Sequence, residues 1–172
     1  HGMFSGTAFL TKEGTVAHTY CGWGSNRNWV QHALDDNLNS WSKPEMMLPK
    51  KDGKYLKNEK YFDPDIWIMD GKYYGLNARS WGEPPVIMKS DNLKDWEFIG
   101  ELLHPDFDEE KLGVKRGEDI SCPNFFKLGD KWVLVCISHK LGCRYFIGDF
   151  VNEQFLPEHH AVLGGSSNLY FA

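Results

Sequence analysis

The chain has 172 residues, of which 41% are hydrophobic and 15% aromatic, so it holds enough apolar material for a packed core and is not disordered in composition. Its formal charge is −5 and its isoelectric point is about 5.8, which leaves no basic face for nucleic acid. The longest apolar run, residues 132–137, is far shorter than the ~20 residues that span a bilayer. We therefore expect neither a nucleic acid nor a membrane partner.

The four cysteines, Cys21, Cys122, Cys136 and Cys143, form no C-x-x-C pair and lie in or beside apolar runs, so we expect buried free thiols. No N-x-S/T acceptor for glycosylation occurs, which favours a cytoplasmic setting. The chain starts at His1 without a charged and apolar leader. A signal segment could lie outside it, so the localisation stays open.

Self-similar segments recur along the chain. The glycines Gly14, Gly71 and Gly129 stand in turn-like surroundings at nearly equal intervals. The segment D-N-L-N-S-W at 36–41 returns as D-N-L-K-D-W at 91–96. A fixed period of this length indicates a repeated supersecondary unit.

Each unit contains short apolar segments separated by turn residues, and no window keeps a helical period, so helix should be scarce. The predicted strands of the first unit are 7–11, 15–21, 29–34 and a short fourth at Trp41. Those of the second are 65–69, 72–77, 86–89 and 96–99, and those of the third are 124–128, 132–138, 143–149 and 154–156. The repeats cover about 4–44, 61–102 and 118–158, with 165–172 as the start of a further unit and with surface connections at 43–60 and 103–117.

Four short antiparallel strands per repeat are typical of a β-propeller blade. Blades are covered on both faces, which explains why the middle strands read as continuous apolar runs. A β-sandwich is the alternative, but it does not require the repeated D-N-L segment. We predict an all-β fold, a partial β-propeller with about three four-stranded antiparallel blades. Because propellers close with about 4 to 8 blades, exposed blade faces should favour self-association.

Acidic residues stand where the first strand of the second and third units begins, at Asp63, Asp65, Glu118 and Asp119. The innermost strands of a propeller run beside its central channel, so these side chains should converge near the axis. Convergent carboxylates suit the cleavage of glycosidic bonds, which needs a proton donor and a second carboxylate. In the alternative interpretation they cap turns or form ion pairs with basic residues, namely Arg79, Lys115 and Arg116.

Several short motifs occur in an order known from one enzyme family. They are F-S-G-T-A at 4–8, Asp63-Pro64 before an apolar strand, C-P-N-F-F at 122–126 and Y-F-A at 170–172. With this ordered set the chain resembles glycoside hydrolase family 32, the invertase or β-fructosidase type, over essentially its whole length, as blades two to four and the start of five. The resemblance implies a five-bladed β-propeller that hydrolyses or transfers fructosyl units with retention. It also implies a carbohydrate ligand, a fructoside or another small glycoside. We expect no cofactor, and no metal site either, because the adjacent His159 and His160 would face opposite ways on a strand.

The resemblance assigns roles to individual residues. Asp63 matches the aspartate of the family's R-D-P motif, which holds sugar hydroxyls, and Phe62 stands at the arginine position. Ser121 stands where the E-C-P motif has its acid/base glutamate, and serine cannot donate that proton. Glu118 and Asp119 are the candidate replacements if the strand bulges there, with Glu118 preferred for its longer reach. The predicted catalytic residues are thus Asp63, Glu118 and Asp119.

The remaining predicted site residues bind substrate. Phe4 and Ser5, which match the family's F-S-G segment, should line the pocket together with Phe62 and Ser121. Trp81 lies in a loop-like segment beside a glycine and could stack on a sugar ring.

The family's nucleophile is the aspartate of an N-D-P motif in the first blade, and no such motif precedes Phe4. Two interpretations stay open. Either the nucleophile belongs to a part of the enzyme outside this chain, or the chain is a carbohydrate-binding or interaction propeller that performs no hydrolysis.

Overall fold

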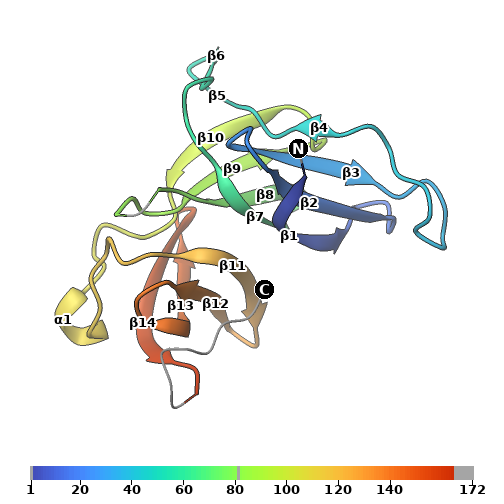
Figure 1. Ribbon diagram of the computed structural model, residues 1–172. Coiled ribbons are helices and arrows are strands. Elements are labelled where there is room, and N and C mark those ends of the chain that lie inside the picture. The colour runs from blue at the N-terminus through green and yellow to red at the C-terminus, as the bar shows by residue number, and fades with distance from the viewer. Residues whose placement is uncertain (1, 81, 165–172) are drawn as a thin grey trace.

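The computed structural model describes residues 2–80 and 82–164, which form three antiparallel β-sheets with one short additional parallel pairing. The only helix in these ranges is the four-residue α1 (Glu109–Leu112), so no helix of the described part is long enough to cross a membrane. Figure 1 shows the three sheets arranged around the region where the first strand of each one lies. The prediction of an all-β chain is confirmed.

The strands follow one another in space in nearly the order of the sequence. The first sheet contains β1 (Met3–Leu10), β2 (Val16–Gly22), β3 (Arg27–His32) and β4 (Glu45–Met46), in that order. The second is built on β7 (Phe62–Met69), β8 (Lys72–Ala78), β9 (Val86–Ser90) and β10 (Trp96–Glu101). The third contains β11 (Ser121–Leu128), β12 (Lys131–Ser138), β13 (Gly142–Val151) and β14 (Gln154–Val162).

Three details differ from the prediction. The connection at 103–117 is not a surface link, because Leu103, Phe107, Leu112 and Val114 are buried in a core cluster with residues of the second and third sheets. The fourth strand of the first sheet is β4, whereas Trp41 makes only an isolated bridge with Ala33. The connection at 43–60 is also more than a surface link, because β5 (Pro49–Lys51) pairs in parallel with β10 and β6 (Lys54–Tyr55) pairs with β5. The second sheet therefore has six strands, and its added strands occupy backbone groups of β10 that would otherwise form an open edge.

The turns between the first two strands of each sheet are made by the repeated glycines. Gly14, Gly71 and Gly129 have φ angles of 79°, 73° and 64°, a left-handed conformation that costs glycine little because it has no Cβ atom. Their regular spacing in the sequence thus marks the same turn in three successive sheets.

The repeated D-N-L segment also folds in the same way twice. Leu38 and Leu93 both adopt left-handed backbone, with φ angles of 59° and 64°. The indole nitrogens of Trp41 and Trp96 donate to the carbonyl oxygens of Leu38 and Leu93, at 3.0 Å in both cases. The sequence echo is therefore a turn closed by its own tryptophan.

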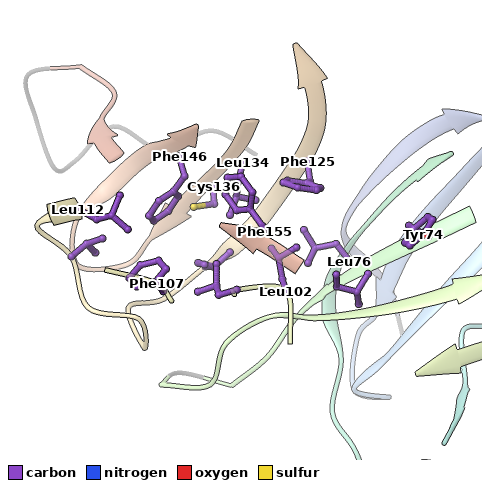
Figure 2. Packing of buried hydrophobic residues seen from close by; sticks show 14 residues of the cluster. Tyr74, Leu76, Leu102, Phe107, Leu112, Phe125, Leu134, Cys136, Phe146 and Phe155 are labelled. Atoms are coloured by element: carbon purple, nitrogen blue, oxygen red, sulfur yellow. The ribbon is translucent and has the colours of Figure 1, made fainter. Parts of the chain in front are cut away.

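Two apolar clusters hold the sheets face to face. Between the second and third sheets, Leu76 and Ile87 pack with Phe125, Leu134 and Phe155, all 2% exposed or less. Figure 2 shows this cluster reaching from the β8 side to the strands of the third sheet. The second cluster joins the first and second sheets and includes Val30, Met47, Ile66, Met88 and Trp96. Sheets stacked in chain order around their innermost strands form a partial β-propeller, as predicted.

Candidate functional site

The first strands of the three sheets, β1, β7 and β11, meet around a small cavity. Its volume is about 130 Å³. Its lining comes from all three sheets and consists of Ser5, Gly6, Thr7, Asp63, Pro64, Cys122, Pro123 and Asn124. We call it the axial cavity, because the innermost strands of a propeller enclose its axis. Of the four carboxylates expected to converge near the axis, only that of Asp63 lines the axial cavity, where it is joined by Ser5; Asp65, Glu118 and Asp119 do not line it.

Asp63 and Cys122 contact each other across this cavity from neighbouring sheets. The backbone N–H of Cys122 donates to Asp63 Oδ2 at 3.0 Å. Both residues have positive φ angles, 41° for Asp63 and 46° for Cys122, and both sit at β-bulges near the start of their strands. Left-handed backbone outside glycine costs about 1–3 kcal/mol per residue and gathers at functional sites. The bulges thus turn two side chains toward one point.

The Cys122 thiol completes this contact. Its Sγ atom lies 3.4 Å from Ser5 Oγ and 3.8 Å from Asp63 Oδ2. Burial raises the pKa of Cys122, and the charges of Asp63 and Asp119 raise it further, so the thiol is protonated at neutral pH and can donate to its neighbours. The expectation of free buried thiols is confirmed for the other three cysteines, whereas Cys122 is half-buried.

Asp65 has a different role from Asp63, although both are on β7. Its side chain is buried and accepts hydrogen bonds from Phe125 N at 2.7 Å and from Thr7 Oγ1 at 3.0 Å. Burial raises the pKa of this carboxyl, against the effect of those hydrogen bonds. Asp65 therefore ties the second sheet to the first and the third and does not line the axial cavity.

A larger pocket opens beside the axial cavity and shares Asp63 with it. We call it the Asp63 pocket; its volume is about 320 Å³, in the range of small-ligand sites. Phe4, Phe62, Asp63, Ala78, Arg79, Ser80 and Ser121 line it. Of the predicted substrate-binding residues, the structure thus brings Phe4, Phe62 and Ser121 together with Asp63. Trp81 lies outside the described residues.

Glu118 and Asp119 line a neighbouring pocket of about 300 Å³, the Glu118 pocket, together with Gly82, Gly117, His139 and Lys140. Asp119 accepts hydrogen bonds from Ser121 Oγ at 2.7 Å through Oδ1 and from His139 N at 3.0 Å through Oδ2. Its Oδ2 atom also lies 2.5 Å from His139 Nδ1. Ser121, which lines the Asp63 pocket, thus connects the two pockets.

Glu118 has fewer protein partners than Asp119. Its Oε1 atom accepts from Ser138 Oγ at 2.5 Å, and Oε2 has no partner among the described residues. The backbone of Glu118 and Asp119 is held by the fully buried Arg144, which donates to their carbonyl oxygens. The strand bulge of β11 falls after Ser121, so Glu118 and Asp119 precede the strand and do not share its alternation.

The alternative that basic residues neutralise these acids does not describe their main contacts. Arg79 pairs with Glu59 and Glu83, Lys115 with Glu109, and Arg116 with Glu101. The carboxylates of the two pockets are held by backbone N–H groups, hydroxyls and His139 instead.

Among the pocket residues that were not predicted as site residues, Cys122, Arg79 and His139 have side chains that could take part in binding or proton transfer. Cys122 belonged to a recognised motif but had no assigned role, and the left-handed backbone that turns it inward has no signature in the residue type. Arg79 was considered only as an ion-pair partner. It directly follows Ala78, whose Cα pairs with that of Phe62 across β7 and β8. His139 follows a predicted strand, and only the fold brings it to Asp119.

Comparison with known proteins decides the family. The model of the glycosyl hydrolases family 32 N-terminal domain matches residues 1–169. The chain belongs to glycoside hydrolase family 32. The resemblance seen in the motifs is thereby confirmed, and with it the propeller of the five-bladed type.

Individual relatives of this family 32 domain are distant. It is 26% identical to sucrose-6-phosphate hydrolase of Klebsiella pneumoniae over 79% of this chain and 29% of that protein. It is 26% identical to an extracellular exo-inulinase of Aspergillus ficuum over 80% of this chain and 28% of that protein. The chain thus spans less than a third of the length of both relatives.

The solved structures agree on the fold. Fructan 1-exohydrolase IIa of Cichorium intybus superposes with a TM-score of 0.67 at 20% identity and covers 95% of this chain and 34% of that one. At this identity the likeness concerns the fold of the family 32 domain alone.

Proposed function

We propose that this family 32 domain binds a β-fructoside-type sugar in the Asp63 pocket and takes part in hydrolysing its glycosidic bond. The observation that carries the proposal is Asp63 itself. Its carboxylate is held by Cys122 N–H at the meeting point of three sheets, and it lines a pocket of sugar size with Phe4 and Phe62. A carboxylate beside aromatic rings suits a sugar, because hydroxyls donate to the oxygens and the apolar ring face packs on the aromatics.

In this proposal Asp63 accepts hydrogen bonds from sugar hydroxyls and Glu118 protonates the leaving oxygen. Glu118 is preferred over Asp119 because one of its oxygens has no partner among the described residues, whereas both oxygens of Asp119 are engaged. Phe62 and Ser121 shape the pocket around the ring, and Ser5 lines the adjoining axial cavity. The nucleophile would come from outside this chain.

The second candidate is a carbohydrate-binding or interaction propeller without turnover. It is supported by Ser121 at the acid/base position and by the absence of an N-D-P motif from the sequence. Both candidates predict sugar binding, and they differ in bond cleavage.

The test combines activity with binding. A panel of fructosides and arabinosides is incubated with the wild-type chain, Glu118→Gln and Asp119→Asn, and calorimetry measures sugar binding by the same proteins. Release of sugar by the wild type that Glu118→Gln abolishes and Asp119→Asn leaves measurable supports the hydrolase with Glu118 as proton donor. Binding without release from any protein rules out hydrolysis by this chain alone, and it favours the binding module only if release is also absent when the part that supplies the nucleophile is present.

We also propose that the chain self-associates through its exposed blade faces. Large apolar side chains are exposed on the innermost strands of the first and third sheets, namely Met3, Phe4, Leu10, Phe126 and Leu128. Exposed apolar surface of this kind marks sites of association.

A further inference from the structure

The Asp63 pocket contains one cation, Arg79, whose surroundings bear on the charge of the ligand. The side chain is 16% exposed and its Nη2 atom lies 2.8 Å from Glu59 Oε2. Its Nε atom donates to Glu83 Oε2 at 3.3 Å. Two of the three guanidinium nitrogens are therefore engaged by carboxylates.

The position of this guanidinium is fixed on other sides as well. It lies over the ring of the buried Tyr61, 5.7 Å from its centroid. Arg27 donates to the backbone carbonyl oxygen of Glu59 and so anchors the segment that carries one of the two carboxylates. Glu83 is anchored by a turn in which its N–H donates to Ser80 O at 3.0 Å. Arg79 is thus held in place before any ligand arrives.

The charges around the pocket do not balance. Glu59 and Glu83, which contact Arg79 but do not line the pocket, carry two negative charges against its one, and Asp63 is the carboxylate of the lining itself. The adjoining Glu118 pocket repeats this excess, with Glu118 and Asp119 against Lys140. A phosphate group carries a charge of about −1.5 to −2 at pH 7 and is bound by Arg or Lys groups whose charge is not already neutralised.

We infer that the Asp63 pocket selects a neutral sugar over a phosphorylated one, with Arg79 as the residue that sets this specificity. This inference rests on the proposed function. The nitrogen Nη1 of Arg79 has no partner among the described residues, so it can donate to a sugar hydroxyl. A phosphoryl group would meet the carboxylates that surround the guanidinium. Both kinds of ligand occur in the names of the relatives, a sucrose-6-phosphate hydrolase and an exo-inulinase.

The decisive measurement is calorimetric titration of the 172-residue chain with sucrose and with sucrose 6-phosphate. Sucrose should bind at least about tenfold more tightly, equal to about 1.4 kcal/mol. In the double variant Glu59→Gln with Glu83→Gln, the amide oxygens still accept from Arg79 but the two negative charges are gone. The affinity for sucrose 6-phosphate should then rise about tenfold, while that for sucrose changes little. Glu97→Gln, which removes an exposed charge on β10, is the matched control and should keep the wild-type ratio.

Two results contradict the inference alone. They are equal or tighter binding of sucrose 6-phosphate by the wild type, and an affinity ratio that the double variant leaves unchanged. Failure of the wild type to bind either sugar contradicts the inference and the proposed function together. Arg79→Gln provides a second readout. It should weaken sucrose binding about tenfold, with a circular dichroism spectrum like that of the wild type. An unchanged affinity for sucrose would show that Arg79 does not contact the sugar.

Discussion

Asp63 and Asp65 stand two positions apart on β7, yet their surroundings give them opposite roles. Asp63 lines two cavities and is reached by one backbone N–H and one thiol. Asp65 is enclosed and accepts hydrogen bonds from Thr7 and Phe125. The bulge between Phe62 and Pro64 separates the two environments, because it breaks the simple alternation of side chains along the strand.

Replacement of Asp63 by Asn should lower sugar affinity and leave the fold intact. Asn tolerates left-handed backbone and its amide oxygen can still accept from Cys122 N–H, so the free energy of unfolding should be nearly unchanged. The loss of a charged acceptor for sugar hydroxyls should weaken binding about tenfold or more, since hydrogen bonds to charged groups contribute about 1.5–3 kcal/mol. Calorimetry with sucrose measures this loss. Asp70→Asn is the control, because Asp70 is also left-handed but lies in the turn at the far end of β7, and an equal loss there would contradict a role for Asp63.

Asp65 should make the free energy of unfolding depend on pH. Because burial raises its pKa in the folded chain above the ordinary value of 3.8, the folded state binds this proton more tightly than the unfolded state. Stability from this group is therefore present at low pH and is lost as pH rises above about 4 through the folded-state pKa.

The Asp65→Asn side chain cannot ionise, so the free energy of unfolding of this variant should depend less on pH above about pH 4. Urea unfolding at pH 4.5 and pH 7.5 measures the difference. Asp130→Asn, at an exposed turn residue, should keep the wild-type slope. A slope equal in wild type and Asp65→Asn would show that Asp65 has no part in the pH dependence.

At the scale of elements, the two D-N-L turns offer a matched pair of sites for mutation. Trp41 and Trp96 make the same indole hydrogen bond. Trp96 is 2% exposed and packs in the cluster between the first and second sheets, whereas Trp41 is half-buried and makes a tilted ring contact with His18. Trp96→Phe should cost about 1–3 kcal/mol, because it leaves a buried carbonyl of Leu93 without its donor. Trp41→Phe should cost less than about 1 kcal/mol. Urea denaturation of both variants measures the difference. Equal losses of unfolding free energy would mean that the burial of the tryptophan does not determine how much its turn contributes to stability.

Much of the element pattern could be predicted from the sequence because local chemistry determines it. Turn glycines, the D-N-L segments and continuous apolar runs each report on a few neighbouring residues. They located most strands of the three sheets, except that the fourth strand of the first sheet is β4 and not Trp41, and that β14 extends well beyond residue 156. The strands β5 and β6 were missed because they are short and polar and lack apolar alternation; their own hairpin is local, but the pairing of β5 with β10 is non-local. The bulges at Asp63 and Cys122 were not predicted, because left-handed backbone outside glycine is imposed by tertiary contacts.

The candidate site was predicted less completely than the fold. Asp63, Phe4, Phe62 and Ser121 were named from motifs and do line one pocket. Arg79, which we infer to set specificity, could not be recognised from the sequence. The carboxylates of Glu59 and Glu83 that neutralise its charge come from separate loops. Charge balance in a pocket is a property of the folded chain.

For the whole molecule, the exposed faces of the first and third sheets predict concentration-dependent association. Leu10 is 62% exposed on β1 and Leu128 is 66% exposed on β11. The double variant Leu10→Glu with Leu128→Glu should lower the association constant about tenfold or more, because charges oppose burial of these faces. Sedimentation velocity over a range of concentrations measures it. Ile68→Glu on the middle sheet, at a side chain 40% exposed, should associate like the wild type, and a monomeric wild type at all concentrations would contradict self-association.

One carboxylate, that of Asp65, is shared by three sheets, and this has a consequence for how the molecule comes apart. If one sheet peeled away, this buried group would lose its donors while the other two sheets were still folded around it, so loss of a single sheet is disfavoured relative to loss of all three. The chain should therefore melt in one step, although its architecture is modular. The Asp63 pocket should be lost in the same step, since Asp63 and Ser121 line it from different sheets and do so only while those sheets are docked. A sugar bound there would contact residues of two sheets. It should therefore slow the separation of those sheets more than the fraying of any outer strand.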